Sequence, residues 1–580
     1  MKMHKIALGV ALSLATLGAA TAASVAPTTT VKIIAINDFH GNLQSPGNFS
    51  GKASGGVDYL AGYVAGLKAA NPYNVVVSAG DLIGASPLIS ALFHDEGSIE
   101  AMNRLGLEFN AVGNHEFDEG KAELLRMQKG GCHPTDANSC KGATVGTPVP
   151  FEGARFKFLA ANVADTATGK TIFPPYGIKS FATPNGTVRV GFIGMTLKET
   201  PTIVTPAGVA GLTFGDEAAT ANAMVKTLRA RGVESIVVLL HQGGAQTNTS
   251  NINGCVGALD GSPIKPIVAQ LDDAVDMVIS GHTHQAYNCS LPNKGGRNIP
   301  VTSANAFGRV VSDIDMTIDN ATGDVTAIAA NNVVVDRTNA AIVPNATIKG
   351  IVDQYSTLVS PIANQVIGSI TADATNAANA AGEMDAGDLI SDAQLQATQP
   401  AAFGGAQIAF VNAGGVRNTG LLFNAQGGTE SPGDVTYGEA FTVQPFGNSL
   451  VTLTLTGQQI KDVLEQQFPG CMGQTVQRVM QVSSGFSYAW SAAAPACSKV
   501  SSISLNGTPI DMTAGYRVTV NNFMSTGGDG FSVLTGGTGL LGGAQDIDAL
   551  VAYLAGFKSP QVAYNPADPA LHKPRITKLP

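Results

Sequence analysis

Five short apolar runs mark the first half of the chain, and each stops at a polar residue that can bind a metal. The segments are TVKIIAIND (30–38), NVVVSAGD (74–81), FNAVGNHEFD (109–118), SIVVLLH (235–241) and VDMVISGHTH (275–284). Short runs rich in β-branched residues predict buried strands of an α/β sheet. Ligands of such sheets gather beyond the carboxyl ends of the strands. We therefore expect the polar ends of the five runs to meet at one rim.

The residues at these ends have the composition of a site for two divalent cations. A single Asp after a strand is usually a turn former or a helix N-cap, and a lone H-x-H is a weak signal. Four of the nine histidines, however, fall inside these segments, and His40 lies two residues beyond the first. The candidate metal ligands are Asp38, His40, Asp81, Asn114, His241, His282 and His284.

A chain of 580 residues is too long for one hydrophobic core, so two domains are expected. The segments 301–319 and 323–336 predict antiparallel strands that close the first domain, which we place at 31–335. Within the linker 336–367, Ile348, Val352, Tyr355 and Leu358 recur at helical spacing, and Pro361 should end or bend that helix. The remainder, 368–580, predicts a second α/β domain dense in glycine turns.

Three motifs in the second half complete a family pattern: VNAGGVRNTG (411–420), YGEAFTVQPFGN (437–448) and NNFMSTGGDGF (521–531). Together with the five strand ends, they resemble the calcineurin-like metallophosphoesterases and, more narrowly, the secreted 5′-nucleotidase family that includes periplasmic UDP-sugar hydrolases. The resemblance implies a two-domain α/β protein. A four-layer α/β/β/α metallophosphoesterase sandwich would be followed by a smaller α/β substrate-binding domain, joined through a linker helix.

The resemblance also assigns roles to the candidate ligands. Asp38, His40, Asp81 and His284 would hold one metal ion, and Asp81, Asn114, His241 and His282 the other. Asp81 would then bridge two cations about 4 Å apart that share and activate a water. Oxygen and nitrogen ligands accept zinc, manganese, cobalt or iron, and the sequence does not choose between them.

His115 and Asp118 are the catalytic dyad of the family that the chain resembles. His115 would stabilise charge on the phosphoryl group or donate a proton to the leaving oxygen, and Asp118 would orient it. In the alternative interpretation, Asp118 only caps a helix and Glu116 does the orienting.

The second domain is expected to grip the substrate. The candidate residues are Asn412, Arg417, Phe446, Phe523 and Asp529. The two Phe would sandwich a base, Asp529 would accept from ribose hydroxyls, and Arg417 would bind phosphate oxygens. The family usually has one or two Arg before Gly387-Asp388-Leu389, but no Arg occurs from Thr371 to Leu389. Arg417 is therefore the only guanidinium expected in the grip.

These assignments predict an exported dimetal phosphohydrolase, a 5′-nucleotidase acting on nucleoside 5′-monophosphates. The alternatives within enzymes are a 2′,3′-cyclic nucleotide phosphodiesterase, a UDP-sugar hydrolase and a broad phosphomonoesterase. The alternative of another class is a non-catalytic secreted nucleotide-binding protein. The expected partner is a small-molecule phosphoester, and the chain is expected to be a monomer or homodimer.

The N-terminal segment, the net charge and the cysteines indicate the compartment and the partners to expect. Residues 1–22 are typical of a secretory signal peptide cut before Ala23, so a periplasmic or secreted protein is expected. The net charge of −9 without Lys/Arg clusters disfavours nucleic acid, and no membrane anchor is visible. Proximity along the chain favours the disulfides Cys132–Cys140, Cys255–Cys289 and Cys471–Cys497, with a zinc cluster as the disfavoured alternative because no CxxC occurs.

Overall fold

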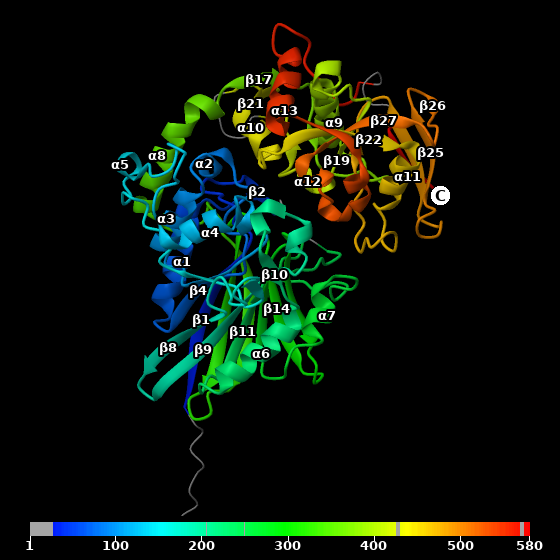
Figure 1. Cartoon of the computed structure of the whole chain (residues 1–580). Coiled ribbons are helices and arrows are strands. Elements are labelled where there is room, and N and C mark those ends of the chain that lie inside the picture. Colours follow the sequence, from blue (N-terminus) through cyan, green and yellow to red (C-terminus); the bar gives the residue numbers. More distant parts are fainter. Residues whose placement is uncertain (1–26, 205, 249, 425–429, 569–573) are drawn as a thin grey trace, which may run out of the picture.

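The computed structural model of the chain describes residues 27–204, 206–248, 250–424, 430–568 and 574–580 (Figure 1). The expected signal peptide, 1–22, lies outside the described residues. The chain forms two α/β domains. The first comes from the N-terminal half, coloured blue to green, and the second from the C-terminal part, coloured yellow to red. The fold class expected from the sequence is confirmed.

Two six-stranded sheets form the N-terminal domain. The order in the first is β16 (Val325–Val334), β15 (Val310–Asp319), β1 (Thr28–Ile36), β4 (Asn74–Ser78), β5 (Phe109–Ala111) and β6 (Lys157–Leu159). The order in the second is β13 (Ala286–Pro292), β14 (Asn298–Ala304), β12 (Met277–Ser280), β11 (Ser235–Leu240), β9 (Gly186–Met195) and β8 (Tyr176–Thr183). The inner strands of both sheets run parallel, whereas β15, β16, β13 and β8 are antiparallel to their neighbours.

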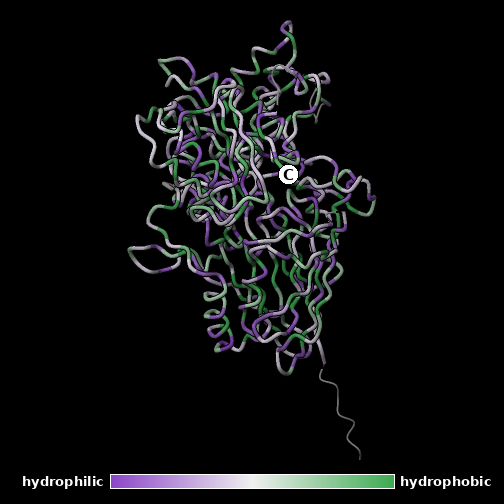
Figure 2. The backbone as a smooth tube through the Cα atoms, turned by 90° about the vertical axis from the view of Figure 1, so that its right-hand side faces the viewer, coloured by the Kyte–Doolittle hydropathy of each residue, from purple (hydrophilic) through white to green (hydrophobic). Residues whose placement is uncertain are grey.

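The side chains of β1 alternate between two cores, as a strand buried on both faces requires. Ile33 and Ala35 meet residues such as Val237 of β11 in the core between the sheets. Ile34 and Ile36 point into the core beneath the outer helices. Figure 2 shows the resulting hydrophobic segments running through the lower half of the molecule.

Helices cover both outer faces of this sandwich. The first sheet is covered by α1 (Val57–Ala70), α3 (Glu96–Leu105), α4 (Gly120–Lys129) and α8 (Ala346–Ala363). The second is covered by α6 (Glu217–Arg229) and α7 (Ile264–Val268). Shorter elements are α2 (Leu88–Ala91), α5 (Gly142–Val145), the β2–β3 hairpin (Asn48–Phe49, Lys52–Ala53) and the β7–β10 pair (Val163–Asp165, Leu212–Phe214). The layers are thus α/β/β/α.

The linker contains the helix that the hydrophobic spacing predicted. Asn345 caps α8 by accepting from the amide of Ile348, and the helix ends two residues after Pro361. Its buried side chains, among them Tyr355, pack on the first domain. Strand β16 ends at Val334 and the next strand, β17 (Val366–Ser369), begins after α8. The domain limits 31–335 and 368–580 remain proposals.

The C-terminal domain is built on a five-stranded sheet. Its order is β23 (Gln481–Val482), β19 (Ile408–Val411), β27 (Gly515–Asn521), β22 (Ser449–Thr456) and β28 (Thr538–Gln545). One core lies against α9 (Asp385–Thr398), α10 (Tyr437–Val443) and α13 (Asp546–Leu554). The other lies against α11 (Gly457–Glu465) and the sheet of β26 (Thr508–Pro509), β25 (Val500–Leu505), β24 (Phe486–Ser491) and β29 (Ile576–Leu579). The pairs β17–β21 (Asp434–Thr436) and β18–β20 (Ala374–Thr375, Gly420–Leu421) and the helix α12 (Asn522–Ser525) complete the domain.

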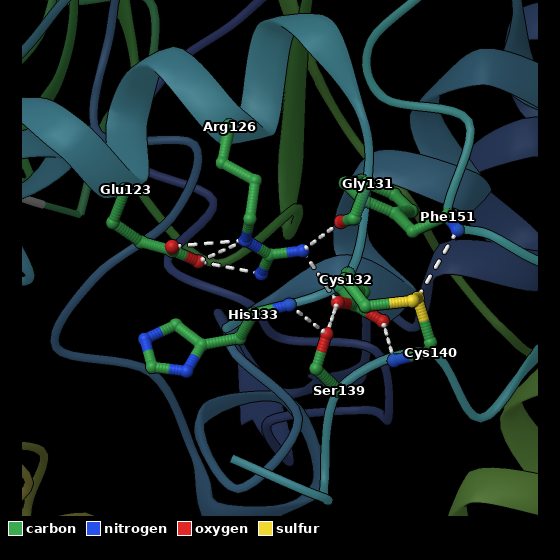
Figure 3. The surroundings of a disulfide bond; sticks show 9 residues. Glu123, Arg126, Gly131, Cys132, His133, Ser139, Cys140 and Phe151 are labelled. Atoms are coloured by element: carbon green, nitrogen blue, oxygen red, sulfur yellow. Dashed lines mark hydrogen bonds and ion pairs between the residues drawn. A yellow bond between two sulfur atoms is a disulfide. The ribbon is translucent and has the colours of Figure 1, made fainter. Parts of the chain in front are cut away.

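All six cysteines pair as their proximity suggested. The disulfides are Cys132–Cys140, Cys255–Cys289 and Cys471–Cys497. Figure 3 shows the first of them beside Arg126 of α4, whose guanidinium donates to the carbonyl oxygen of Gly131 at 2.6 Å. Buried Glu96 accepts from the amide of Cys140 at 2.7 Å, which fastens the disulfide loop to α3.

His94 provides a second link between the disulfide loop, residues 132–140, and the rest of the domain. Its Nδ1 lies 2.6 Å from a carboxylate oxygen of Glu119, and its Nε2 lies 3.0 Å from one of Asp136. The ring of His133 stacks on it at 4.4 Å between centroids. The hydrogen bond with Glu119 raises the pKa of His94 to about 9, although burial acts in the opposite direction. His94 is therefore an imidazolium held between two carboxylates at neutral pH.

This link predicts a pH-dependent contribution to stability. A folded-state pKa near 9, raised above the unfolded value of about 6.5, gives stability that is complete below pH 6.5 and lost as the pH rises through 9. Because Glu119 and Asp136 are partly exposed, we expect His94→Gln to cost on the order of 1–2 kcal/mol at pH 6. Thermal unfolding at pH 6 and pH 10 checks this. The difference from the wild type should disappear at pH 10, and a pH-independent difference would contradict the ion-pair interpretation.

Candidate active site

The candidate ligands follow the carboxyl ends of five parallel strands drawn from both sheets. Asp38, Asp81 and Asn114 follow β1, β4 and β5 of the first sheet. His241 and His282 follow β11 and β12 of the second. The two sheets therefore deliver their ligands to the same rim, which is where the sequence predicted a common site.

Glycines precede several ligands because the loops pass very close to one another. A Cβ at Gly113 would lie 2.2 Å from Oδ1 of Asp81 and 2.6 Å from its amide nitrogen. A Cβ at Gly80 would lie 2.5 Å from Nδ1 of His241. The G-D and G-N-H motifs thus reflect a steric requirement of neighbouring loops.

The backbone at the site is strained. Five candidate ligands have φ in the left-handed region, between 47° and 74°, which side chains other than glycine rarely adopt. They are Asp38, His40, Asp81, His282 and His284. Such conformations persist only where the surrounding structure fixes them, and they cluster at functional sites.

Two groups of potential metal ligands emerge. In the first, which contains Asp38, His40 and His284, the ligand atoms all lie within 4.8 Å of one another. The Nε2 atoms of His40 and His284 are 3.0 Å apart. The Nε2 of His284 is also 3.6 Å from Oδ1 of Asp38.

The second group contains Asp81, His241 and His282, again with ligand atoms within 4.8 Å. The Oδ1 of Asn114 lies 3.1 Å from Nε2 of His241 and 3.0 Å from Nδ1 of His282. The Oδ2 of Asp81 lies 3.0 Å from Nε2 of His241 and 3.6 Å from Nε2 of His40. Asp81 therefore faces both groups, as a bridging ligand would.

The spacing of these residues, and the protonation of three of their four histidines, fit metal ions. Ligand atoms bonded to one cation at roughly 2.0–2.2 Å lie about 3–3.5 Å from one another. Burial lowers the pKa of His40 and of His282 to about 3, and it lowers that of His284 well below its usual value. These imidazoles are neutral, which is the form that binds metals. Burial also raises the pKa of Asp38 to about 7, so a neighbouring cation would stabilise its charged form.

Hydrogen bonds outside the two groups fix the orientation of the ligands. The Nδ1 of His40 faces the carbonyl oxygen of Gly84, and that of His241 faces the carbonyl oxygen of Ala79, both at 2.8 Å. These contacts leave each Nε2 free for a metal. The amide of His115 donates to Oδ1 of Asp81 at 2.9 Å, which leaves Oδ2 for the two groups.

Glu116 ties two of the ligand loops together. Its buried carboxylate accepts from the amides of Asp81, Leu82 and Gly113 at 3.0, 2.8 and 2.6 Å. Glu116 therefore contacts the backbone of the ligand loops. The carboxylate that faces the imidazole of His115 is that of Asp118. Both of its oxygens lie within 3.0 Å of Nδ1. Burial lowers the pKa of His115, but the charges of Asp118 and Asp81 outweigh it, and the net shift is upward.

One pocket brings the dyad and the expected substrate-binding residues together. Its volume is about 150 Å³, and its N-terminal wall includes Asn114, His115, Asp118 and His282. The C-terminal wall contains all five candidate substrate residues: Asn412, Arg417, Phe446, Phe523 and Asp529. The ring of Phe446 stacks on the imidazole of His115 at 5.7 Å between centroids, a contact that the sequence did not suggest.

The expectation that Arg417 is the only guanidinium in the grip is wrong. Arg478 also lines the pocket, and its Nη1 donates to Oδ1 of Asp529 at 2.9 Å. Its Nε is buried and has no hydrogen-bond partner within the described part of the chain. Arg478 comes from the segment between α11 and β23, outside every recognised motif, so only its positive charge could have drawn attention to it.

A third group, His94, Glu119 and Glu123, also has ligand atoms within 4.8 Å of one another. Both nitrogens of His94 already face carboxylates, and Arg126 donates to both oxygens of Glu123 at 3.0 and 2.9 Å. We therefore interpret this group as an ion-pair cluster.

Comparison with known proteins agrees with the geometry. A model of calcineurin-like phosphoesterases matches residues 31–286, and a model of the C-terminal domain of 5′-nucleotidases matches residues 366–536. The chain belongs to the 5′-nucleotidase family. It is a metallophosphoesterase of that family.

Individual relatives cover the chain almost completely. Endonuclease YhcR of Bacillus subtilis is 30% identical over 548 residues, which are 92% of this chain and 40% of the relative. Cell wall protein Lmo0130 of Listeria monocytogenes is 32% identical over 541 residues, 88% of this chain and 65% of the relative. The chain thus spans less than two thirds of these relatives. The 5′-nucleotidase precursor from Thermus thermophilus has a TM-score of 0.74 and 28% identity, covering 95% of this chain and 99% of that chain.

The close approach of the ligand loops gives a testable prediction. In Gly113→Ala the new Cβ would displace Asp81, so we expect metal affinity to fall roughly 10–100-fold, as for other residues that position ligands. Metal content after dialysis against graded chelator, measured by mass spectrometry, checks this. Gly66→Ala in α1 is the matched control, since nothing lies within 4 Å of its Cβ position. Equal metal retention by the two variants would contradict the steric requirement.

Proposed function

We propose that the chain is an exported phosphohydrolase that uses two divalent metal ions to release phosphate from nucleoside 5′-monophosphates. The observation that carries the proposal is the convergence of His115, Arg417 and the Asn114–His282 edge of the second metal group in one pocket. Asp38, His40, Asp81 and His284 would hold one ion. Asp81, Asn114, His241 and His282 would hold the other. Bound there, the ions supply activation of the attacking water and neutralise charge on the phosphoryl oxygens.

Arg417 has the properties of a phosphate ligand. Within the described ranges its guanidinium makes no hydrogen bond. It lies over the ring of Phe446 at 5.7 Å. Burial lowers the pKa of His40 and His284, and the charge of Arg417 lowers both further, so the guanidinium is close to the first metal group. The guanidinium of Arg417 is half-buried beside the first metal group and makes no hydrogen bond to a protein acceptor among the described residues. It is therefore available to donate hydrogen bonds to the oxygens of a phosphate.

His115 would act on the leaving oxygen. Its Nδ1 faces Asp118, so Nε2 carries the second proton of the imidazolium. The upward shift of its pKa favours that charged form, which can donate to an alkoxide as the phosphorus–oxygen bond breaks. Asp118 is held in turn by the amide of Ala85 at 2.9 Å.

The nucleoside would be bound by the C-terminal wall. Phe446 and Phe523 offer aromatic faces for a base, and stacking of this kind tolerates different bases. Asp529 is fixed by Asn412 at 2.8 Å and by Arg478 at 2.9 Å, which leaves further lone pairs for ribose hydroxyls. A 2′,3′-cyclic nucleotide, a UDP-sugar or a simple phosphomonoester remains the second candidate class. Binding without turnover is the alternative outside enzymes.

Location and assembly are part of the proposal. Three disulfides and a cell wall relative are consistent with a protein outside the cytoplasm. Among the helices of the described ranges, none has both the length and the apolar character that a bilayer crossing requires. We propose a periplasmic or secreted monomer or homodimer.

Phosphate release from AMP, UMP, ATP, UDP-glucose, 2′,3′-cyclic AMP and p-nitrophenyl phosphate tests the function. We expect chelation to abolish turnover, metal re-addition to restore it, and AMP or UMP to be preferred. His115→Ala should lower kcat by about 100-fold or more, since it removes the proton donor. His133→Ala, at a half-buried histidine outside the pocket wall, is the matched control and should keep wild-type activity.

The outcomes separate the candidates. Turnover of p-nitrophenyl phosphate or the cyclic nucleotide alone would support the metal centre and reject the nucleoside-binding role proposed for the C-terminal wall of the pocket. No turnover with any metal would leave a non-catalytic nucleotide-binding protein as the remaining interpretation. Equal activity of the two histidine variants would remove His115 from the mechanism.

Arg478 provides a separate prediction about the grip. We expect Arg478→Met to raise KM for AMP about tenfold, or roughly 1.4 kcal/mol, because Asp529 loses its cationic partner. KM for p-nitrophenyl phosphate should stay within about threefold, since that substrate has no ribose. Steady-state kinetics measures both. Arg155→Met, at an exposed ion pair with Glu152, is the control. Equal increases for both substrates would assign Arg478 to the phosphate instead.

A further inference from the structure

A second cavity adjoins the candidate active site on the side of the linker helix. This linker chamber has a volume of about 330 Å³, and α8, α10, the loop after β1 and the segment 417–420 border it. It is about twice the size of the first pocket and falls within the usual range for ligand sites, roughly 300–1,000 Å³. No step proposed above uses it.

The inner end of the linker chamber is lined by residues that contact candidate metal ligands and the dyad. Arg417 lines both cavities. The ring of Phe307, which also lines the chamber, lies 5.2 Å from that of His284 and 6.0 Å from that of His40. Ala85, another lining residue, donates its amide to Asp118. Arg417 is therefore shared by the two cavities. The first contains Asn114 and His282 of the second metal group, and the linker chamber contains Phe307, which packs on His40 and His284 of the first.

The linker chamber is polar but poorly suited to anions. Hydroxyl and amide side chains dominate its polar lining, among them Gln44, Ser356, Ser360 and Asn364. Its charged residues within the described part of the chain are Arg417 at the inner end and the carboxylates of Glu430 and Glu439. An uncharged group with several hydroxyls finds both donors and acceptors there. A further phosphate or a nucleic-acid strand would meet two carboxylates.

The stereochemistry of phosphoryl transfer gives this cavity a use. The attacking and leaving oxygens lie roughly in line, and the other three oxygens spread around the phosphorus between them. The leaving alcohol belongs next to His115, in the first pocket. A monoester has no further substituent, whereas a diester has one on an oxygen beside the line of attack. The substituent on that oxygen, which we call the second ester arm, must extend away from the phosphorus to one side of the line of attack.

We propose that the linker chamber binds the second ester arm of a phosphodiester, and that this arm is an uncharged polyhydroxy group such as glycerol or a sugar. The inference rests on the proposed phosphohydrolase function and extends it to diesters. In the reaction, the oxygen of water bonds to phosphorus and the phosphorus–oxygen bond to the alcohol in the first pocket breaks. That alcohol leaves with a proton from His115, a proton of the water restores His115, and the arm in the chamber departs as a phosphomonoester.

Two substrates with the same leaving group test the proposal. They are p-nitrophenyl phosphate, which has one arm, and glyceryl p-nitrophenyl phosphate, which adds a glycerol arm. We expect the wild type to release p-nitrophenol from both. Ser360→Trp fills the chamber from α8 and should lower kcat/KM for the diester at least about tenfold, while changing the value for the monoester less than about threefold. The matched control is Thr357→Trp on the exposed face of α8, which should change neither value.

Each other outcome overturns the proposal in a recognisable way. Hydrolysis of the monoester without the diester rejects the second arm and leaves the proposed function intact. Equal losses for both substrates in Ser360→Trp, or no loss for either, show that the chamber does not hold the arm. Failure of the wild type on both substrates with every metal rejects the phosphohydrolase, and the inference falls with it.

Discussion

The buried carboxylate of Asp81 is the group around which the N-terminal domain is organised. One oxygen accepts from the amide of His115, and the other faces histidines of both candidate metal groups. A carboxylate in this position is costly to bury unless hydrogen bonds and positive charge surround it. Glu116 fixes the backbone on either side by accepting from the amides of Asp81 and Gly113. The strained ligand loops and the glycines that let them approach one another serve the same arrangement.

Much of this arrangement can be predicted from the sequence, because it follows from local patterns. Short runs rich in β-branched residues, and the polar residues at the ends of five of them, predict the parallel sheets and their common rim. The spacing of Ile348, Val352 and Tyr355 predicts α8. The disulfides follow from proximity because each pair closes a short segment of chain. The roles of the site residues remain predictions supported by geometry.

The features that could not be predicted depend on contacts between distant segments. Arg478 reaches the pocket because its loop packs on Asp529, 51 residues away, and nothing in the local sequence marks that contact. The stack of Phe446 on His115 joins the two domains, and so depends on how they meet. The linker chamber likewise has walls from both domains and from α8, and no single stretch of sequence describes it.

The position of Arg417 couples the two domains electrostatically. It belongs to the C-terminal domain, yet its positive charge acts on His40 and His284 of the N-terminal domain. With the domains in contact as here, a fixed cation repels the metal ions that the centre must attract, and a phosphate dianion between them relieves that repulsion. Binding free energies are reciprocal, so phosphate must strengthen metal binding by the same factor by which the metals strengthen phosphate binding. Under the proposed function phosphate is the reaction product. It would then stabilise the bound metal ions and the contact between the domains, and separation of the domains would withdraw the guanidinium and weaken phosphate binding.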